Sequence, residues 1–250
     1  MPEEPLPDPD RTPRSDADPG EGIPETILSP RLLAATDGEV SSRRVELRRV
    51  AAATRALIEG LVGTDASEAL IAETADELER LVAPFTADHP RSIYDGVSES
   101  AMAGAEPDAF FDHSPIIGRA NPLSPPVTLE MVDDVVQATV TFGSAYEGPP
   151  GCVHGGYVAA AFDEVLGAAQ TVSGSPGMTG TLIVRYRSPT PLHTALRIEG
   201  ELDRTEGRKV FTVGRMFAGD VLTAEAEAIF VSIGPERFQK LREERDARFA

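Results

Sequence analysis

Apolar side chains recur at helical spacing in two stretches near the start of the chain. The first runs from about residue 40 to 61 and comprises Leu47, Val50, Ala51, Thr54, Leu57, Ile58 and Leu61. After a polar break at 63–65, a second stripe comprises Leu70, Ile71, Thr74, Leu78, Leu81 and Val82. Positions three and four apart share one face of a helix. The two stretches therefore predict an α-hairpin, whose end is marked by Pro84 and Pro90.

The second half of the chain alternates between apolar and polar positions, which is typical of half-buried strands. The alternating stretches lie at about residues 127–131, 136–142, 182–186, 196–203, 209–217 and 222–230. Between the second and the third, residues 154–170 are rich in alanine and glycine and have helical character. A helix of small residues can lie close against a curved sheet. We therefore predict an α+β fold, in which an antiparallel sheet wraps around one long central helix and the α-hairpin is an N-terminal extension.

Changes in composition divide the chain into four segments. Residues 1–35 are rich in acidic residues and proline, which predicts a disordered tail. Residues 36–120 contain the α-helical extension and a linker, residues 121–235 contain the sheet and its helix, and residues 236–250 are a charged helix or tail.

The overall charge and the cysteine content exclude several classes of protein. A net charge of −18 argues against a nucleic-acid surface, because binding phosphates needs clustered lysine and arginine. The longest apolar stretch is interrupted by two acidic residues, so we expect no membrane insertion, and the first residues do not have the pattern of a signal peptide. With Cys152 as the single cysteine, the chain fits a reducing cytoplasm.

Candidate chemistry gathers around the central helix in three motifs that follow one another. They are GPPGCVHGGYVAAAFDE, which contains His154, then MTGTLIVRYRSPTPL, and then LDRTEGRKVFTVG. Asp163 lies nine residues after His154, and Thr179 opens the next strand. From about residue 127 to 233, this ordered set resembles the hotdog-fold acyl-CoA thioesterases of the phenylacetate-pathway type, in the branch that includes the human thioesterase superfamily proteins.

The resemblance implies hydrolysis of acyl-CoA thioesters to a free acid and coenzyme A. In the family, glycine N–H groups bind the oxygen that gains charge, a role that falls here to Gly156, alone or together with Gly155. The family's aspartate acts as general base or nucleophile, which corresponds to Asp163. Thr179 resembles the threonine that positions the attacking water, and His154 would orient the substrate carbonyl or the loop.

Physical chemistry supports these roles. Free N–H groups at a helix start, with the helix dipole behind them, stabilise a developing negative charge. Glycine leaves such groups open to an approaching thioester, because it has no side chain.

Further residues are candidates for holding the substrate. We expect the acyl chain to lie near Tyr157, Phe162 and Leu166, and the phosphates of coenzyme A to contact Arg187, Arg208 and Lys209. Guanidinium groups suit phosphate geometry. No organic cofactor is expected, because water is the second substrate. The histidines have no spacing typical of a metal site, so we predict no metal.

The spacing of the motif also predicts assembly. Gly156 and Asp163 are seven residues apart, which is about 10 Å along a helix. One thioester carbonyl cannot lie against both. Two antiparallel central helices related by a twofold axis would bring Asp163 of one chain to Gly156 of the other. We therefore predict a homodimer with two composite sites, with a dimer of dimers as the alternative assembly.

Other interpretations remain open. The same fold also supports enoyl-thioester hydratases and dehydratases, and a non-catalytic acyl-CoA-binding interaction protein is a second alternative. Glu164 follows Asp163 and is expected to be structural. Cys152 lies close to His154, but we expect a small buried cysteine there and not a nucleophile.

Overall fold

The computed structural model describes residues 42–86, 112–175, 177–233, 240 and 243–244. The tail predicted for 1–35 and nearly all of the segment 236–250 lie outside the described residues. The same holds for most of the linker after the α-hairpin. The four segment boundaries therefore stay predictions.

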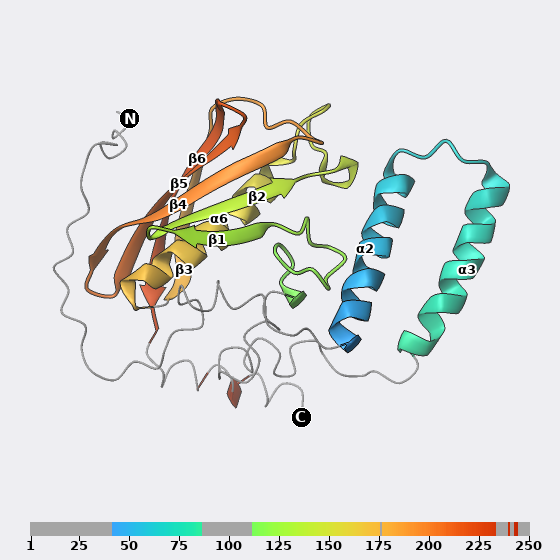
Figure 1. Cartoon of the computed structure of the whole chain (residues 1–250), viewed down its shortest axis with the longest axis horizontal. Helices are drawn as coiled ribbons and strands as arrows, with labels where there is room; N and C mark the ends of the chain where they lie inside the picture. Colours follow the sequence, from blue (N-terminus) through green and yellow to red (C-terminus); the bar gives the residue numbers. More distant parts are fainter. Residues whose placement is uncertain (1–41, 87–111, 176, 234–239, 241–242, 245–250) are drawn as a thin grey trace.

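A six-stranded antiparallel sheet wraps around one long helix, in the order β1-β2-β4-β5-β6-β3 (Figure 1). The helix is α6 (Gly155–Ala169). The strands are β1 (Thr128–Val132), β2 (Val135–Thr141), β3 (Gly177–Tyr186), β4 (Ala195–Glu206), β5 (Lys209–Ala218) and β6 (Val221–Ser232). The predicted order of two strands, a helix and four strands is confirmed. The strand that directly follows α6, β3, forms one edge of the sheet.

Tight turns fix the register of the sheet. Asp133 and Asp134 have φ values of 50° and 64° in the turn between β1 and β2, a left-handed conformation that two-residue hairpin turns require. Gly207, with φ 58°, serves the turn between β4 and β5. In this register Val136 and Ala138 are buried against the helix.

The core lies between α6 and the concave face of the sheet. Phe162, Val165 and Leu166 of α6 have no exposed surface. Opposite them, Gly200 of β4 pairs directly with Gly214 of β5. A Cβ at Gly200 would lie 2.7 Å from Val165 Cγ1, and one at Gly214 would lie 3.0 Å from Leu166 Cδ2. This glycine pair lets the helix approach the sheet closely.

The predicted α-hairpin is present as α2 (Ser42–Val62) and α3 (Glu68–Thr86). As predicted, α3 ends between Pro84 and Pro90, at Thr86, and Pro84 lies inside its last turn. Of the stripe predicted on α2, Ala51 is buried and Leu61 is exposed. On α3 the stripe is mostly exposed, and the helix lies beyond α2, away from the sheet (Figure 1).

Candidate active site

Asp163 and Thr179 form a hydrogen-bonded pair. Asp163 lies in the middle of α6 and is only half-buried, because its side chain does not point into the core. The Thr179 hydroxyl, near the start of β3, donates to Asp163 Oδ1 at 2.8 Å. The structure therefore places a carboxylate and a hydroxyl at one accessible point between the helix and the edge strand.

A second polar group lies at the start of α6. His154 is the N-cap residue, and its Nδ1 accepts the Gly156 N–H at 3.0 Å. The N–H of Gly155 has no partner among the described residues. Of the two backbone donors expected to stabilise an oxyanion, that of Gly155 is open, and that of Gly156 is engaged by the histidine ring. A substrate oxygen would share the Gly156 donor with the imidazole or displace it.

Close neighbours leave little room for a side chain at either glycine of the motif. The Tyr186 hydroxyl donates to the Gly155 carbonyl at 2.8 Å, and a Cβ at Gly155 would lie 3.0 Å from that hydroxyl oxygen. A Cβ at Gly156 would lie 3.1 Å from His154 Nδ1. Tyr186 ends β3, so the strand that carries Thr179 at one end also holds the start of α6 at the other. Tyr186 was not predicted as a site residue, because the sequence shows only an aromatic residue at the end of a predicted strand.

Aromatic side chains form a wall beside the helix start. Tyr157 is 36% exposed, and the Tyr146 ring meets it edge-on with 4.8 Å between ring centroids. Phe142 packs against both rings. Burial raises the pKa of Tyr146, and its hydroxyl donates to the Leu123 carbonyl at 3.2 Å. Tyr157 is thus placed where a substrate beside His154 can touch it.

Phe162 and Leu166 have a different role from the predicted one. Both side chains have no exposed surface and pack toward the sheet glycines. They are core residues, because the face of α6 that meets the sheet includes these two positions. Of the three residues expected to line the acyl chain, Tyr157 alone reaches the surface of this chain.

The predicted phosphate contacts are also partly engaged. Arg187 forms an ion pair with Glu225 at 2.5 Å between Nε and Oε2. Arg208 donates from Nε and Nη2 to the Ser232 carbonyl, and Lys209 is exposed. In the single chain Arg187 is therefore neutralised, whereas Arg208 and Lys209, at the turn between β4 and β5, form no ion pair with the residues that the structure describes.

Glu164 and Cys152 lie near the candidate site in the sequence and were not expected to take part in the chemistry. Glu164 Oε1 accepts a hydrogen bond from the Ser114 hydroxyl at 2.9 Å, and burial raises the pKa of Glu164. Glu164 thus ties α6 to the segment before the sheet, as expected of a structural residue. Cys152 is half-buried, less than expected, and its thiol lies 3.6 Å from the Pro150 carbonyl oxygen.

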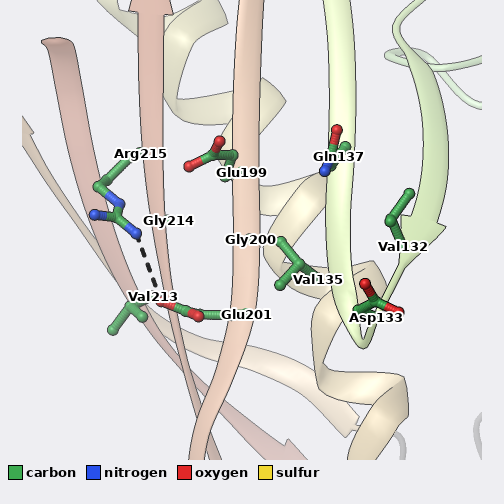
Figure 2. Close-up of a pocket in the computed structure, with 10 residues that line it drawn as sticks. All are labelled: Val132, Asp133, Val135, Gln137, Glu199, Gly200, Glu201, Val213, Gly214 and Arg215. Atoms are coloured by element: carbon green, nitrogen blue, oxygen red, sulfur yellow. Dashed lines mark ion pairs between the residues drawn. The ribbon is translucent and has the colours of Figure 1, made fainter. Parts of the chain in front are cut away.

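A hollow in the described surface lies away from these residues. A depression of about 300 Å³ on the outer face of the sheet is lined by polar and charged side chains, including Gln137, Glu199, Glu201 and Arg215 (Figure 2). None of the candidate residues lines it. Within the described residues, no group of His, Cys, Asp or Glu side chains could hold a metal ion, and no helix is long and apolar enough to cross a bilayer.

The fold and the site define a hotdog-type domain, in which a long helix presents a carboxylate beside an edge strand. The sequence profile described as the thioesterase superfamily matches residues 150–228. A crystal structure of a thioesterase superfamily protein is 33% identical, with a TM-score of 0.65, and the match covers 78% of this chain and 96% of the other. The chain belongs to the thioesterase superfamily.

The match to that crystal structure reaches beyond the sheet domain. The 78% of the 250-residue chain that it covers is about 195 residues, whereas the predicted domain at 121–235 has 115. Residues 121–250 number 130, so the match must also include at least about 65 residues that precede residue 121.

Curated relatives match a shorter segment. Acyl-coenzyme A thioesterase THEM4 of Xenopus laevis is 38% identical over 95 residues, which are 37% of this chain and 43% of the relative. Acyl-coenzyme A thioesterase THEM5 of Homo sapiens is 35% identical over 69 residues, 28% of each chain. The match thus spans less than half the length of these relatives.

Proposed function

We propose that the chain hydrolyses acyl-CoA thioesters to a free carboxylic acid and coenzyme A. The observation that carries the proposal is the hydrogen bond between Thr179 and Asp163, at 2.8 Å, on a domain of this family. Relatives that share this segment are named acyl-coenzyme A thioesterases. A hydroxyl that holds a carboxylate on an accessible helix face suits the activation of water.

The proposed reaction uses groups from the helix and the edge strand. The Asp163 carboxylate takes a proton from water while the water oxygen attacks the thioester carbonyl, and Thr179 fixes the carboxylate. The N–H groups of Gly155 and Gly156 stabilise the oxyanion. When the C–S bond breaks, the proton passes from the carboxyl group to the departing sulfur, which leaves as the thiol of coenzyme A.

The site is proposed to be complete in a homodimer. In one chain the helix start and Asp163 remain about 10 Å apart along α6. Two features support pairing across β3. This strand is an unpaired sheet edge with exposed Met178, Ile183 and Tyr186, and the neighbouring face of α6 offers small, half-buried residues such as Ala159 and Ala160. An exposed edge strand offers a row of N–H and C=O groups with which the strand of another chain can pair.

The proposal also covers the cellular location, the metabolic role and the substrate contacts of the protein. We propose a cytoplasmic location, since a single cysteine suits a reducing compartment, and a role in fatty acid metabolism. No organic cofactor is included, because water supplies the only other reactant. Arg208 and Lys209 are retained as candidates for contacting the phosphates of coenzyme A.

The test is a thiol-release assay over acyl-CoAs of increasing chain length. We expect turnover with the native chain, loss of turnover in Asp163→Asn, and retained turnover in Glu164→Gln, the adjacent carboxylate on the same helix. Analytical ultracentrifugation should show the same dimer for all three. Equal activity of Asp163→Asn and the native chain would contradict the proposal, as would loss of enoyl absorbance without thiol release.

Complementation tests the composite site directly. Asp163→Asn and Gly156→Val should each be inactive as homodimers. When they are co-expressed, about half of the dimers are mixed and each mixed dimer has one intact site, so activity should recover to about a quarter of the native value. If each site belonged to a single chain, no recovery would occur.

A further inference from the structure

The N-terminal helix α2 contacts the sheet domain through polar side chains at helical spacing. Arg44 and Arg48 both bind Asp112, at 2.7 and 2.6 Å. About two turns after Arg48, Arg55 donates to the carbonyls of Asn121 and Arg119. These contacts share one face of α2 because positions four and seven apart lie above one another. They hold α2 along the segment that precedes the sheet.

The last polar residue on this face reaches the loop before the candidate site. Glu59 accepts the Ser144 N–H at 2.8 Å and the Ala145 N–H at 3.3 Å. These donors begin the short 3-10 helix η2 (Ser144–Tyr146), whose first N–H groups have no partner within the helix. The hydrogen bond from Ser144 is the largest cause of the lowered pKa of Glu59. A Cβ at Gly143 would lie 2.4 Å from Glu59 Oε2, so the glycine makes room for the carboxylate.

The η2 helix in turn holds the start of α6. The Tyr146 carbonyl accepts the His154 N–H at 2.8 Å, and its ring packs edge-on against Tyr157 in the first turn of α6. His154 is the residue whose ring caps Gly156. The continuous path from α2 to the proposed oxyanion donors therefore consists of Glu59, η2 and His154.

We infer that Glu59 is a positioning residue for the proposed thioesterase site: its carboxylate fixes η2, and η2 fixes the N-cap histidine and the N–H groups of α6. The inference rests on the proposed function and gives the N-terminal extension a role in it. Glu59 touches no reacting atom. Its effect should fall on the chemical step, because the donors it aligns act on the charge that develops there.

The principal variant is Glu59→Gln, with Glu46→Gln as its control. Glu46 is on the same helix and exposed, and it pairs only with Arg49 one turn away. In Glu59→Gln the amide nitrogen opposes one of the two backbone donors. We expect kcat of thiol release to fall about three- to tenfold with KM within about twofold of the native value, and no change in Glu46→Gln.

A second readout is independent of turnover. In chain labelled with ¹⁵N-histidine, the ring nitrogens of His154 report whether Nδ1 accepts the Gly156 N–H. We expect these signals to shift in Glu59→Gln and to stay unchanged in Glu46→Gln. Native kcat together with native His154 signals in Glu59→Gln would overturn the inference. If the native chain shows no thiol release, the proposed function fails, and the His154 signals alone still decide the positioning.

Gly143→Ala tests the same contact from the other side and covers the case in which Glu59→Gln does not fold. The added methyl group would displace the Glu59 carboxylate, so kcat and the His154 signals should change as in Glu59→Gln. In a Glu59→Ala background the methyl group has room and should add nothing. An equal loss of kcat from Gly143→Ala in both backgrounds would show that the effect is local to the glycine, and would overturn the inference.

Discussion

Replacing Thr179 by valine removes one hydrogen bond from the candidate site while keeping the shape of the side chain. The native hydroxyl lies 2.8 Å from Asp163 Oδ1. A hydrogen bond to a charged group contributes about 1.5–3 kcal/mol, and each 1.36 kcal/mol of transition-state stabilisation is about tenfold in rate. Because the pair is accessible in the single chain, the lower end of this energy range applies there. The upper end applies if the proposed dimer covers the pair. We expect kcat to fall at least about tenfold, and up to about a hundredfold in a dry interface.

The assay is release of coenzyme A thiol by Thr179→Val, compared with Thr179→Ser and Thr181→Val. Thr179→Ser keeps the hydroxyl and should retain most of the activity. Thr181→Val makes the same change on the same strand, at an exposed position, and should be close to native. If Thr179→Val had native kcat, the hydroxyl would have no part in holding the carboxylate, and the proposed roles of both residues would have to be withdrawn.

Three further predictions concern the helix and its surroundings. Gly200→Ala should destabilise the fold by about 1–3 kcal/mol, because its Cβ would lie 2.7 Å from Val165 Cγ1. Thermal melts measure this loss. The control Gly60→Ala should not be destabilised, because the added Cβ has nothing within 4 Å. Burial raises the pKa of Glu164, so the folded chain holds this proton to higher pH than the unfolded chain and loses stability as pH rises through that range. Glu164→Gln should therefore gain stability relative to native as pH rises, in urea melts between about pH 4 and 7, and a constant difference would contradict this. Tyr186→Phe, which removes the hydroxyl bound to the carbonyl at the helix start, should lower kcat several-fold with an unchanged dimer in sedimentation.

The sheet could be predicted from the sequence because its strands alternate cleanly. With side chains on a period of two, the alternating runs have only one orientation that buries Val136 and Ala138. The turns also carried their own signal, since two aspartates in succession tolerate the left-handed backbone at Asp133 and Asp134. The placement of Asp163 beside Thr179 came from resemblance to a family and from no pattern of hydrophobicity.

The helix faces were harder to predict because α6 is apolar nearly all round. Alanines and glycines occupy both its core face and its accessible face, so periodicity does not distinguish Phe162, which is buried, from Tyr157, which is 36% exposed. The α2 contacts were missed for the opposite reason. The prediction for α2 rested on its apolar stripe, whereas the face that contacts the sheet domain carries Arg48, Arg55 and Glu59. The partners of these three residues lie far away in the sequence.

The bare edge at β3 also matters for how the chain is made. In the single chain, β3 is a ten-residue edge strand with exposed Met178, Ile183 and Tyr186, and such an edge is a template on which misfolded chains can stack. Rapid overexpression should therefore favour inclusion bodies, whereas slower synthesis leaves time for correct pairing. Ile183→Lys should improve solubility and weaken the proposed dimer, so the strand proposed to form the dimer is also the one that exposes the chain to aggregation.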